Sequence, residues 1–282
     1  MRIFHFILSH SIFIAVCAVA LCLQTNILLQ IPHDYNLYSL VFFSTICSYN
    51  FYWLLSKFYF SNNKQLLVFI KQNSSYFLLC ILSGIALLYF LFQQPHLIKV
   101  VLVSVSLTLL YSLPILPFSI FKYFKKWGFF KTIVLSFSWA FVTTVLPYTT
   151  YQNITFAVEL KQAVLLLLFV RFCFMLLLCI LFDKRDTALD KMNGLHSMAT
   201  DIKQQYLQYI LLAFFWLYII ASLYFCYKYA NSLQATAFIS IGILFIILYL
   251  QSLKIKGYVF YYFGVDGLML LSGIFTYLAS IL

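Results

Sequence analysis

Residues 156–182 read FAVELKQAVLLLLFVRFCFMLLLCILF, and at residue 183 the chain changes abruptly to DKRDTALDKMNG. A helix that crosses a membrane needs about 20 predominantly apolar residues. The apolar stretch is at least that long, and it lacks the alternation that is typical of a membrane-spanning β-strand. We therefore expect a transmembrane helix over residues 156–182 that ends at a charged connection.

The composition of the whole chain supports a membrane protein. Of its 282 residues, 64% are hydrophobic and 9% are charged, whereas globular chains carry about 25% charged residues. So few charges cannot cover the surface of a soluble domain of this size, which excludes a soluble enzyme. The high hydrophobicity also excludes a disordered chain. The seven cysteines all lie in apolar runs, so they indicate neither a disulfide framework nor a zinc site.

Eight further apolar runs have the length of a spanning helix. Polar or turn residues separate them, and we expect the first run to be a retained helix and not a cleaved signal peptide. The nine predicted spans are residues 11–29, 37–60, 75–94, 97–117, 131–148, 156–182, 207–229, 233–253 and 258–282. The prediction is an all-α integral membrane protein in which residues 1–282 form a single transmembrane helical domain.

The basic residues give an orientation, because Lys and Arg collect in cytoplasmic connections. One set of alternating connections, with the N-terminus, carries fourteen of them: Arg2, Lys57, Lys64, Lys71, Lys122, Lys125, Lys126, Lys131, Lys184, Arg185, Lys191, Lys203, Lys254 and Lys256. The opposite set carries only Lys99, Lys161 and Lys228. We therefore predict nine spans with a cytoplasmic N-terminus, in a multi-pass protein of a bacterial inner membrane.

The net charge of +11 is compatible at first sight with nucleic-acid binding. The positive residues are spread over alternating connections, however, and do not form one face of a soluble domain. They are explained by topology and by attraction to anionic headgroups. We expect membrane lipids as partners and no nucleic acid.

Three of the seven acidic residues fall within eight positions: Asp183, Asp186 and Asp190. On a helix these spacings place the carboxylates on one face. Mg²⁺ prefers oxygen ligands and is often shared with substrate phosphates, and the interleaved basic side chains could bind phosphate oxygens. The alternative is a solvated connection whose acids are neutralised by their own Lys and Arg neighbours.

Residues 182–194 resemble the second aspartate-rich motif of the UbiA-type intramembrane prenyltransferase family, which reads roughly DxRDxxxDxxxG. The matching positions are Asp183, Arg185, Asp186, Asp190, Lys191 and Gly194. Upstream, TLLYSLPILP resembles the Tyr-Ser-x-Pro end of the family's fourth helix through Tyr111, Ser112 and Pro114. A basic loop with Lys126 follows, and Lys131 resembles the lysine that opens the fifth helix, which Trp139 also fits.

The resemblance implies a nine-helix bundle of the UbiA type and prenyl transfer from an isoprenoid diphosphate to an aromatic or lipid acceptor at the cytoplasmic face. In the family, two aspartate-rich motifs hold Mg²⁺, which binds the diphosphate. The resemblance implies Asp183, Asp186 and Asp190 as catalytic metal ligands. It implies a second set of residues around the substrate: Asn50, Tyr111, Lys126, Lys131, Arg185 and Lys191.

The first aspartate-rich motif of the family, N-D-x-x-D-x-x-x-D, is degenerate in this chain. Asn50 remains, but the three Asp positions hold Phe51, Leu54 and Phe58. One motif could hold one Mg²⁺ but not two. Altered chemistry, a substrate with less phosphate, or binding without catalysis would each account for the loss. Asn50 itself could bond a headgroup or could make a hydrogen bond between helices.

Two functions therefore remain open. The first is a UbiA-like prenyltransferase with altered or reduced activity. The alternative is a non-catalytic membrane protein, or a subunit of a partner enzyme, that binds an isoprenoid lipid.

Two charges lie within predicted spans, Arg171 and Asp266. Charges inside a membrane are costly and are usually paired or functional. We expect either an ion pair between them or a place for both in the wall of a cavity.

Overall fold

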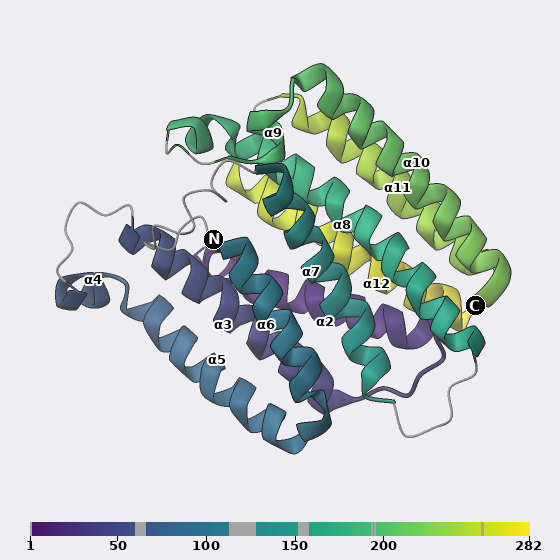
Figure 1. The fold of residues 1–282 in the computed structure, drawn as a ribbon, viewed down its shortest axis with the longest axis horizontal. Helices are drawn as coiled ribbons and strands as arrows, with labels where there is room; N and C mark the ends of the chain where they lie inside the picture. Colours follow the sequence, from purple (N-terminus) through teal and green to yellow (C-terminus); the bar gives the residue numbers. More distant parts are fainter. Residues whose placement is uncertain are drawn as a thin grey trace.

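In a computed structural model, the chain is mostly helical, with short turns between helices, in the part that the structure describes, namely residues 2–59, 66–112, 128–151, 158–192, 194, 196–254 and 257–282. Long helices lie side by side in a bundle (Figure 1), and none of these residues belongs to a β-strand. The predicted all-α class is confirmed.

The bundle is built mainly from long helices joined by short connections. In chain order they are α1 (Arg2–Ser9), α2 (Ile12–Leu28), α3 (Tyr35–Tyr59), α4 (Leu66–Gln72), α5 (Ser74–Gln93), α6 (Ile98–Ser112), α7 (Gly128–Thr149), α8 (Val158–Met192), α9 (Met198–Asp201), α10 (Gln204–Tyr229), α11 (Ser232–Ser252) and α12 (Asp266–Ile281). A short 3-10 helix, Pro95–Leu97, precedes α6, and a π-helical segment, Phe260–Val265, precedes α12.

Within the described ranges, six helices are long and apolar enough to cross a membrane: α5, α7, α8, α10, α11, and the π-helical segment together with α12. A seventh span forms if α1 and α2, which meet at a bend of 65°, are taken together. This chain is therefore a multi-pass membrane protein. Helix α8 does not end at residue 182 as expected, because it continues through the charged residues to Met192.

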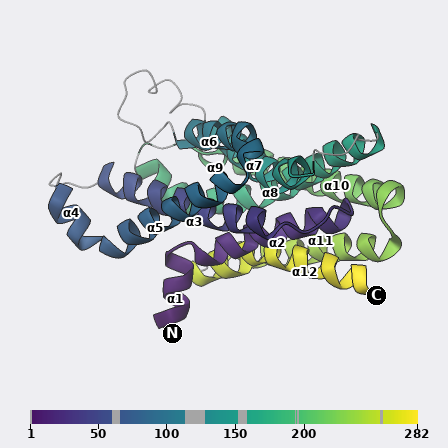
Figure 2. The ribbon, with the colours of Figure 1, turned by 90° about the horizontal axis from the view of Figure 1, so that it is seen from below.

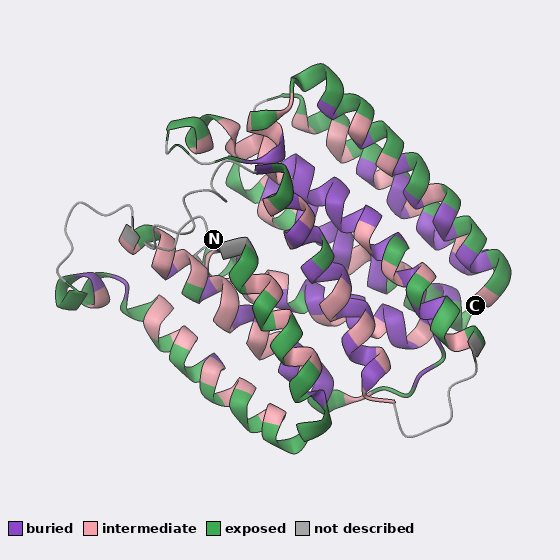
Figure 3. Ribbon diagram, in the orientation of Figure 1, coloured by how far each residue is buried: buried purple, intermediate pink, exposed green. Residues whose placement is uncertain are grey.

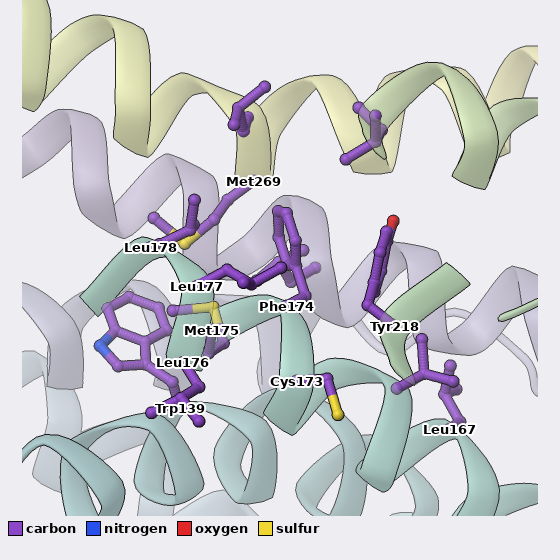
Figure 4. Packing of buried hydrophobic residues seen from close by; sticks show 14 of the residues in the cluster. Trp139, Leu167, Cys173, Phe174, Met175, Leu176, Leu177, Leu178, Tyr218 and Met269 are labelled. Carbon is purple, nitrogen blue, oxygen red and sulfur yellow. The ribbon is translucent and has the colours of Figure 1, made fainter. Parts of the chain in front are cut away.

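Helix α8 forms the centre of the bundle. In the most apolar 18-residue stretch of α8, 72% of the residues are buried inside the protein, whereas the corresponding value for α5 is 6%. Figure 3 shows buried residues concentrated on the inner helices and exposed residues along α5, α10 and α11 at the edges. Successive residues of α8 from Cys173 to Leu178 pack in all directions, with Tyr218 and Trp139 among their neighbours (Figure 4).

Polar side chains and a glycine hold α2 against α12. The Gln24 amide donates to the hydroxyls of Ser272 at 2.9 Å and Thr276 at 2.8 Å. Gly273 lies so close to Ala20 that an added Cβ would be 2.7 Å from the Ala20 carbonyl oxygen. Small residues and hydroxyls commonly let membrane helices approach in this way.

The view turned by 90° places α6 and α7 on one side of the molecule and α12 on the other, with α2 between them (Figure 2). The short helix α9 covers one end of the bundle, where α8 ends and α7 begins (Figure 1). The aspartates of α8 lie at this end, which we call the polar end.

Candidate functional site

The polar end is assembled by a close approach of backbones. Gly128 opens α7, and a Cβ there would lie 2.2 Å from the main-chain nitrogen of Ser197. The Gly128 amide donates to Asp201 at 3.0 Å, and His196 contacts the other oxygen of that carboxylate at 2.7 Å. Only glycine fits this position, so it fixes residues 196–201 against the start of α7.

Asp183 joins α7, α8 and α9 through one carboxylate oxygen. Its Oδ2 accepts hydrogen bonds from the Thr132 hydroxyl at 2.5 Å and from the Met198 main-chain nitrogen at 3.2 Å. The Met198 nitrogen is a free donor at the first turn of α9, and a carboxylate is a favourable partner there. This carboxylate therefore holds α7, α8 and α9 together.

Asp186 forms a two-bond ion pair with its neighbour Arg185, whose Nε and Nη2 each lie 2.7 Å from a carboxylate oxygen. The guanidinium is also surrounded by the rings of Phe182, Tyr261 and Tyr262, with centroids 4.9, 5.2 and 4.8 Å from its central carbon. Such contacts stabilise a cation by its attraction to the ring faces. Both tyrosines belong to the π-helical segment. One nitrogen of Arg185, Nη1, is buried and has no hydrogen-bond partner.

Lys131, in the first turn of α7, connects the aspartates to the interior. It is half-buried and interacts electrostatically with Asp183, Asp186 and Asp190, and also with Tyr52 of α3. Lys131 of α7 and the three aspartates of α8 are thus brought together. Lys131 gives the polar end a cation between the carboxylates and α3.

The three aspartates do not form a metal cage. Among the residues that the structure describes, no three His, Cys, Asp or Glu side chains converge where a metal ion could be held. Asp183 faces Thr132, and both oxygens of Asp186 face Arg185. This arrangement does not fit a Mg²⁺ ion bound by all three carboxylates. Magnesium binding stays a prediction.

A cavity of about 390 Å³ opens beside this cluster, between α2, α3, α5, α6 and α7. Its size is within the usual range for small-ligand sites. The wall is mostly apolar, with contributions such as Leu40, Val105 and Val142, and a few hydroxyls interrupt it, including Ser44, Ser104 and Ser138. Tyr52 belongs to the wall and also interacts with Lys131, so one edge of the apolar cavity meets the polar end.

Trp139 separates this cavity from the core. One side of the α7 residue contributes to the wall, and its neighbours on the other side include α8 residues of the core (Figure 4). The indole nitrogen donates to the Tyr49 hydroxyl at 3.2 Å, which fixes both rings in the wall. The resemblance placed Trp139 on the fifth helix of the family, and the structure adds its contact with the cavity.

The degenerate first motif lies beside the cavity but does not present polar groups to it. Phe51 lines the cavity, Leu54 is buried, and Phe58 packs edge-on against Phe69. The Asn50 amide donates to the carbonyl oxygens of His10 at 3.0 Å and Ile46 at 2.8 Å, and Asn50 is not part of the cavity wall. Its observed role is a hydrogen bond between helices.

Of three further predicted substrate-binding residues, the structure describes the side chain of one. Lys191 is exposed near the end of α8. Tyr111 belongs to α6, but its side chain is not described, and Lys126 lies outside the described residues. The structure therefore concentrates the candidate site on Lys131, Arg185 and the aspartates.

The expected ion pair between Arg171 and Asp266 is wrong. Ion pairs in the described ranges include those of Arg185 with Asp186 and of His196 with Asp201, but Arg171 and Asp266 do not form one with each other. Arg171 instead donates to the Leu21 carbonyl oxygen at 3.2 Å and approaches two threonine hydroxyls at 3.4 Å. The helix geometry explains this result, because α2 and α7 present oxygen acceptors in the core at the level of Arg171.

Sequence reasoning missed several residues that shape the polar end. Thr132 and Asp201 hold the helix ends together, and Tyr262 contributes to the setting of Arg185. Lys184 lies over the Tyr249 ring, 4.8 Å from its centroid, and its ammonium is buried without a hydrogen bond. Thr132 could have been predicted because it follows the candidate residue Lys131 in the sequence. The other contacts depend on tertiary packing.

Comparison of the chain with protein-family models, with curated proteins and with solved structures gave no match.

Proposed function

We propose that this protein binds an isoprenoid-type lipid inside the membrane, with the apolar chain in the cavity between α3, α6 and α7. The anionic headgroup lies at the polar end, beside Lys131. The observation that carries the proposal is the shared position of Tyr52, which lines the apolar cavity and interacts with Lys131.

The chemistry of both ends supports this orientation. Burying an apolar chain among aliphatic and aromatic side chains is favourable. At the other end, Lys131 is a cation that a phosphate could share with the aspartates, and Arg185 has a buried nitrogen without a hydrogen bond. Phosphate oxygens are suitable acceptors for such donors.

Prenyl transfer is the second candidate function, and the position of Lys131 between carboxylates and cavity favours it. In that reaction the bond between the prenyl carbon and the diphosphate oxygen breaks, and the acceptor forms the new bond and releases a proton. The cations would stabilise charge on the departing diphosphate. The cavity would hold the allylic cation away from water, near the aromatic face of Trp139.

We also propose a UbiA-like bundle of nine membrane crossings in a bacterial inner membrane, with a cytoplasmic N-terminus. Nine described helices of at least 15 residues coincide with the nine predicted runs. Helices α3 and α6 are the two that fall outside the six candidate spans and the bent pair. The alternation of basic connections supports the orientation.

The test is a binding and turnover assay with tritiated farnesyl diphosphate on purified protein in nanodiscs, with and without a lipid-extract acceptor. Lys131→Gln should weaken binding about tenfold, which corresponds to roughly 1.4 kcal/mol. Lys161→Gln, an exposed lysine at the other end of the bundle, is the matched control and should bind normally.

The outcomes separate the candidates. Binding without turnover supports lipid binding, and turnover that requires Lys131 supports prenyl transfer. Lys131→Arg should retain part of the binding, because it keeps the charge. Equal binding by wild type and Lys131→Gln would refute the proposed headgroup position.

A further inference from the structure

Cys47 of α3 and Cys80 of α5 meet in a reciprocal contact. The Cys47 thiol donates to the Cys80 carbonyl oxygen at 3.7 Å, and the Cys80 thiol donates to the Cys47 carbonyl oxygen at 3.8 Å. The pair joins positions 33 residues apart in the chain.

The packing of α3 on α5 creates this contact. Gly84 lies one turn after Cys80 on the same face of α5, and a Cβ at Gly84 would be 3.7 Å from the Cys47 sulfur. This is an ordinary van der Waals distance, and it places the Cys47 thiol between the two helices, next to Gly84. Sulfur atoms on neighbouring helices can form a disulfide only when their backbones approach closely.

The pair differs from the other cysteines in its access to ligands. Cys47 and Cys80 are both half-buried, whereas the remaining five are buried: Cys17, Cys22, Cys173, Cys179 and Cys226. Cys47 belongs to the wall of the apolar cavity. An oxidant that reaches it through the cavity must be lipid-soluble, because a charged oxidant such as glutathione disulfide is disfavoured in an apolar site.

We propose that Cys47 and Cys80 are a dithiol that a membrane-soluble quinone oxidises to a disulfide between α3 and α5. The reaction is a two-electron exchange. The two thiols lose two protons and two electrons and form one sulfur–sulfur bond. The quinone takes up both protons and both electrons and leaves as the hydroquinone.

The disulfide would change the outer wall of the cavity. Helix α5 is the most exposed of the candidate spans, because only 6% of the residues in its apolar stretch are buried. It packs mainly on α3. A covalent link at Cys47 would fix α5 against α3. The disulfide would have this effect whichever lipid the cavity holds.

The test uses the full chain in nanodiscs, treated with a short-chain ubiquinone whose ring positions are all substituted, so that thiols cannot add to the ring. Free thiols are then alkylated with N-ethylmaleimide in denaturant, and adducts are counted by intact mass. Seven adducts are expected before oxidation, because all seven cysteines are free, and two fewer afterwards. Peptide mapping should show Cys47 linked to Cys80.

Variants supply the controls. Cys47→Ala and Cys80→Ala should each abolish the quinone-dependent loss of adducts, whereas Cys226→Ala should lose the same two adducts as wild type. Retention of every adduct after quinone treatment would overturn the proposal. A link that forms with diamide or glutathione disulfide but not with the quinone would also overturn it, because the oxidant would then not be membrane-soluble.

Discussion

At the residue scale, Asp183 and Lys131 divide the work of the polar end. One oxygen of Asp183 holds α7 and α9, whereas Lys131 is placed between the aspartates and the cavity. The sequence motif gives both residues the appearance of ligands for a phosphate–metal complex. The contacts of Asp183 assign it a positioning role in the described structure.

Asp183→Ala is expected to lower the free energy of unfolding by about 2 kcal/mol, because a hydrogen bond to a charged group contributes about 1.5–3 kcal/mol. Asp183→Asn should cost less, since an amide oxygen can still accept both bonds. Denaturant titration in detergent micelles measures the difference.

Glu159→Ala is the matched control for this prediction, because Glu159 is an exposed acid in the first turn of the same helix. It should change stability by well under half as much. If the Asp183→Ala protein were as stable as wild type, Asp183 would not stabilise the contact of α8 with α7 and α9.

At the scale of the elements, the junction of α7 with α9 places the candidate site. Gly128 permits the backbone of residues 196–197 to lie against the start of α7, and Asp201 bonds the Gly128 amide. This junction sets the position of Lys131 one turn later on α7. Its integrity is therefore a condition for headgroup binding.

Gly128→Ala is expected to separate α9 from α7, since the new Cβ would lie 2.2 Å from the Ser197 nitrogen. Hydrogen–deuterium exchange over residues 196–201 should become faster by at least tenfold, which corresponds to a loss of about 1.4 kcal/mol of local stability.

The control is Gly267→Ala, because a Cβ there meets only the Phe13 ring at an ordinary 3.8 Å. Exchange over residues 196–201 should be unchanged in this variant. Unchanged exchange in Gly128→Ala as well would contradict the docking of α9 described here.

At the scale of the whole molecule, the apolar core surrounds α8, and an apolar cavity lies beside it with one edge next to the polar end. The cavity lies between helices from different parts of the chain, and the polar end joins α7, α8 and α9. A lipid with an apolar chain and an anionic head has the matching division of character. This correspondence is the basis of the proposed function.

Much of this architecture could be predicted from particular residues. The apolar run before residue 183 predicted α8, and the spacing of Asp183, Asp186 and Asp190 predicted one helical face. The different hydrogen-bond partners of these acids were not predictable, because Thr132 and Met198 meet Asp183 only in the folded chain and the pairing of Asp186 with Arg185 depends on side-chain orientation. Likewise, no local pattern shows that Arg171 finds its oxygen acceptors on α2 and α7 and does not pair with Asp266.

The most direct measurement is photo-crosslinking with a diazirine-bearing farnesyl diphosphate analogue, followed by mass spectrometry of the labelled peptides. Adducts are predicted on cavity residues of α3, α6 and α7, such as Phe51, Val105 and Val142, and excess farnesyl diphosphate should suppress them. Adducts confined to exposed faces of α10 and α11, such as Ile243 and Trp216, would contradict the claim that the cavity holds the lipid.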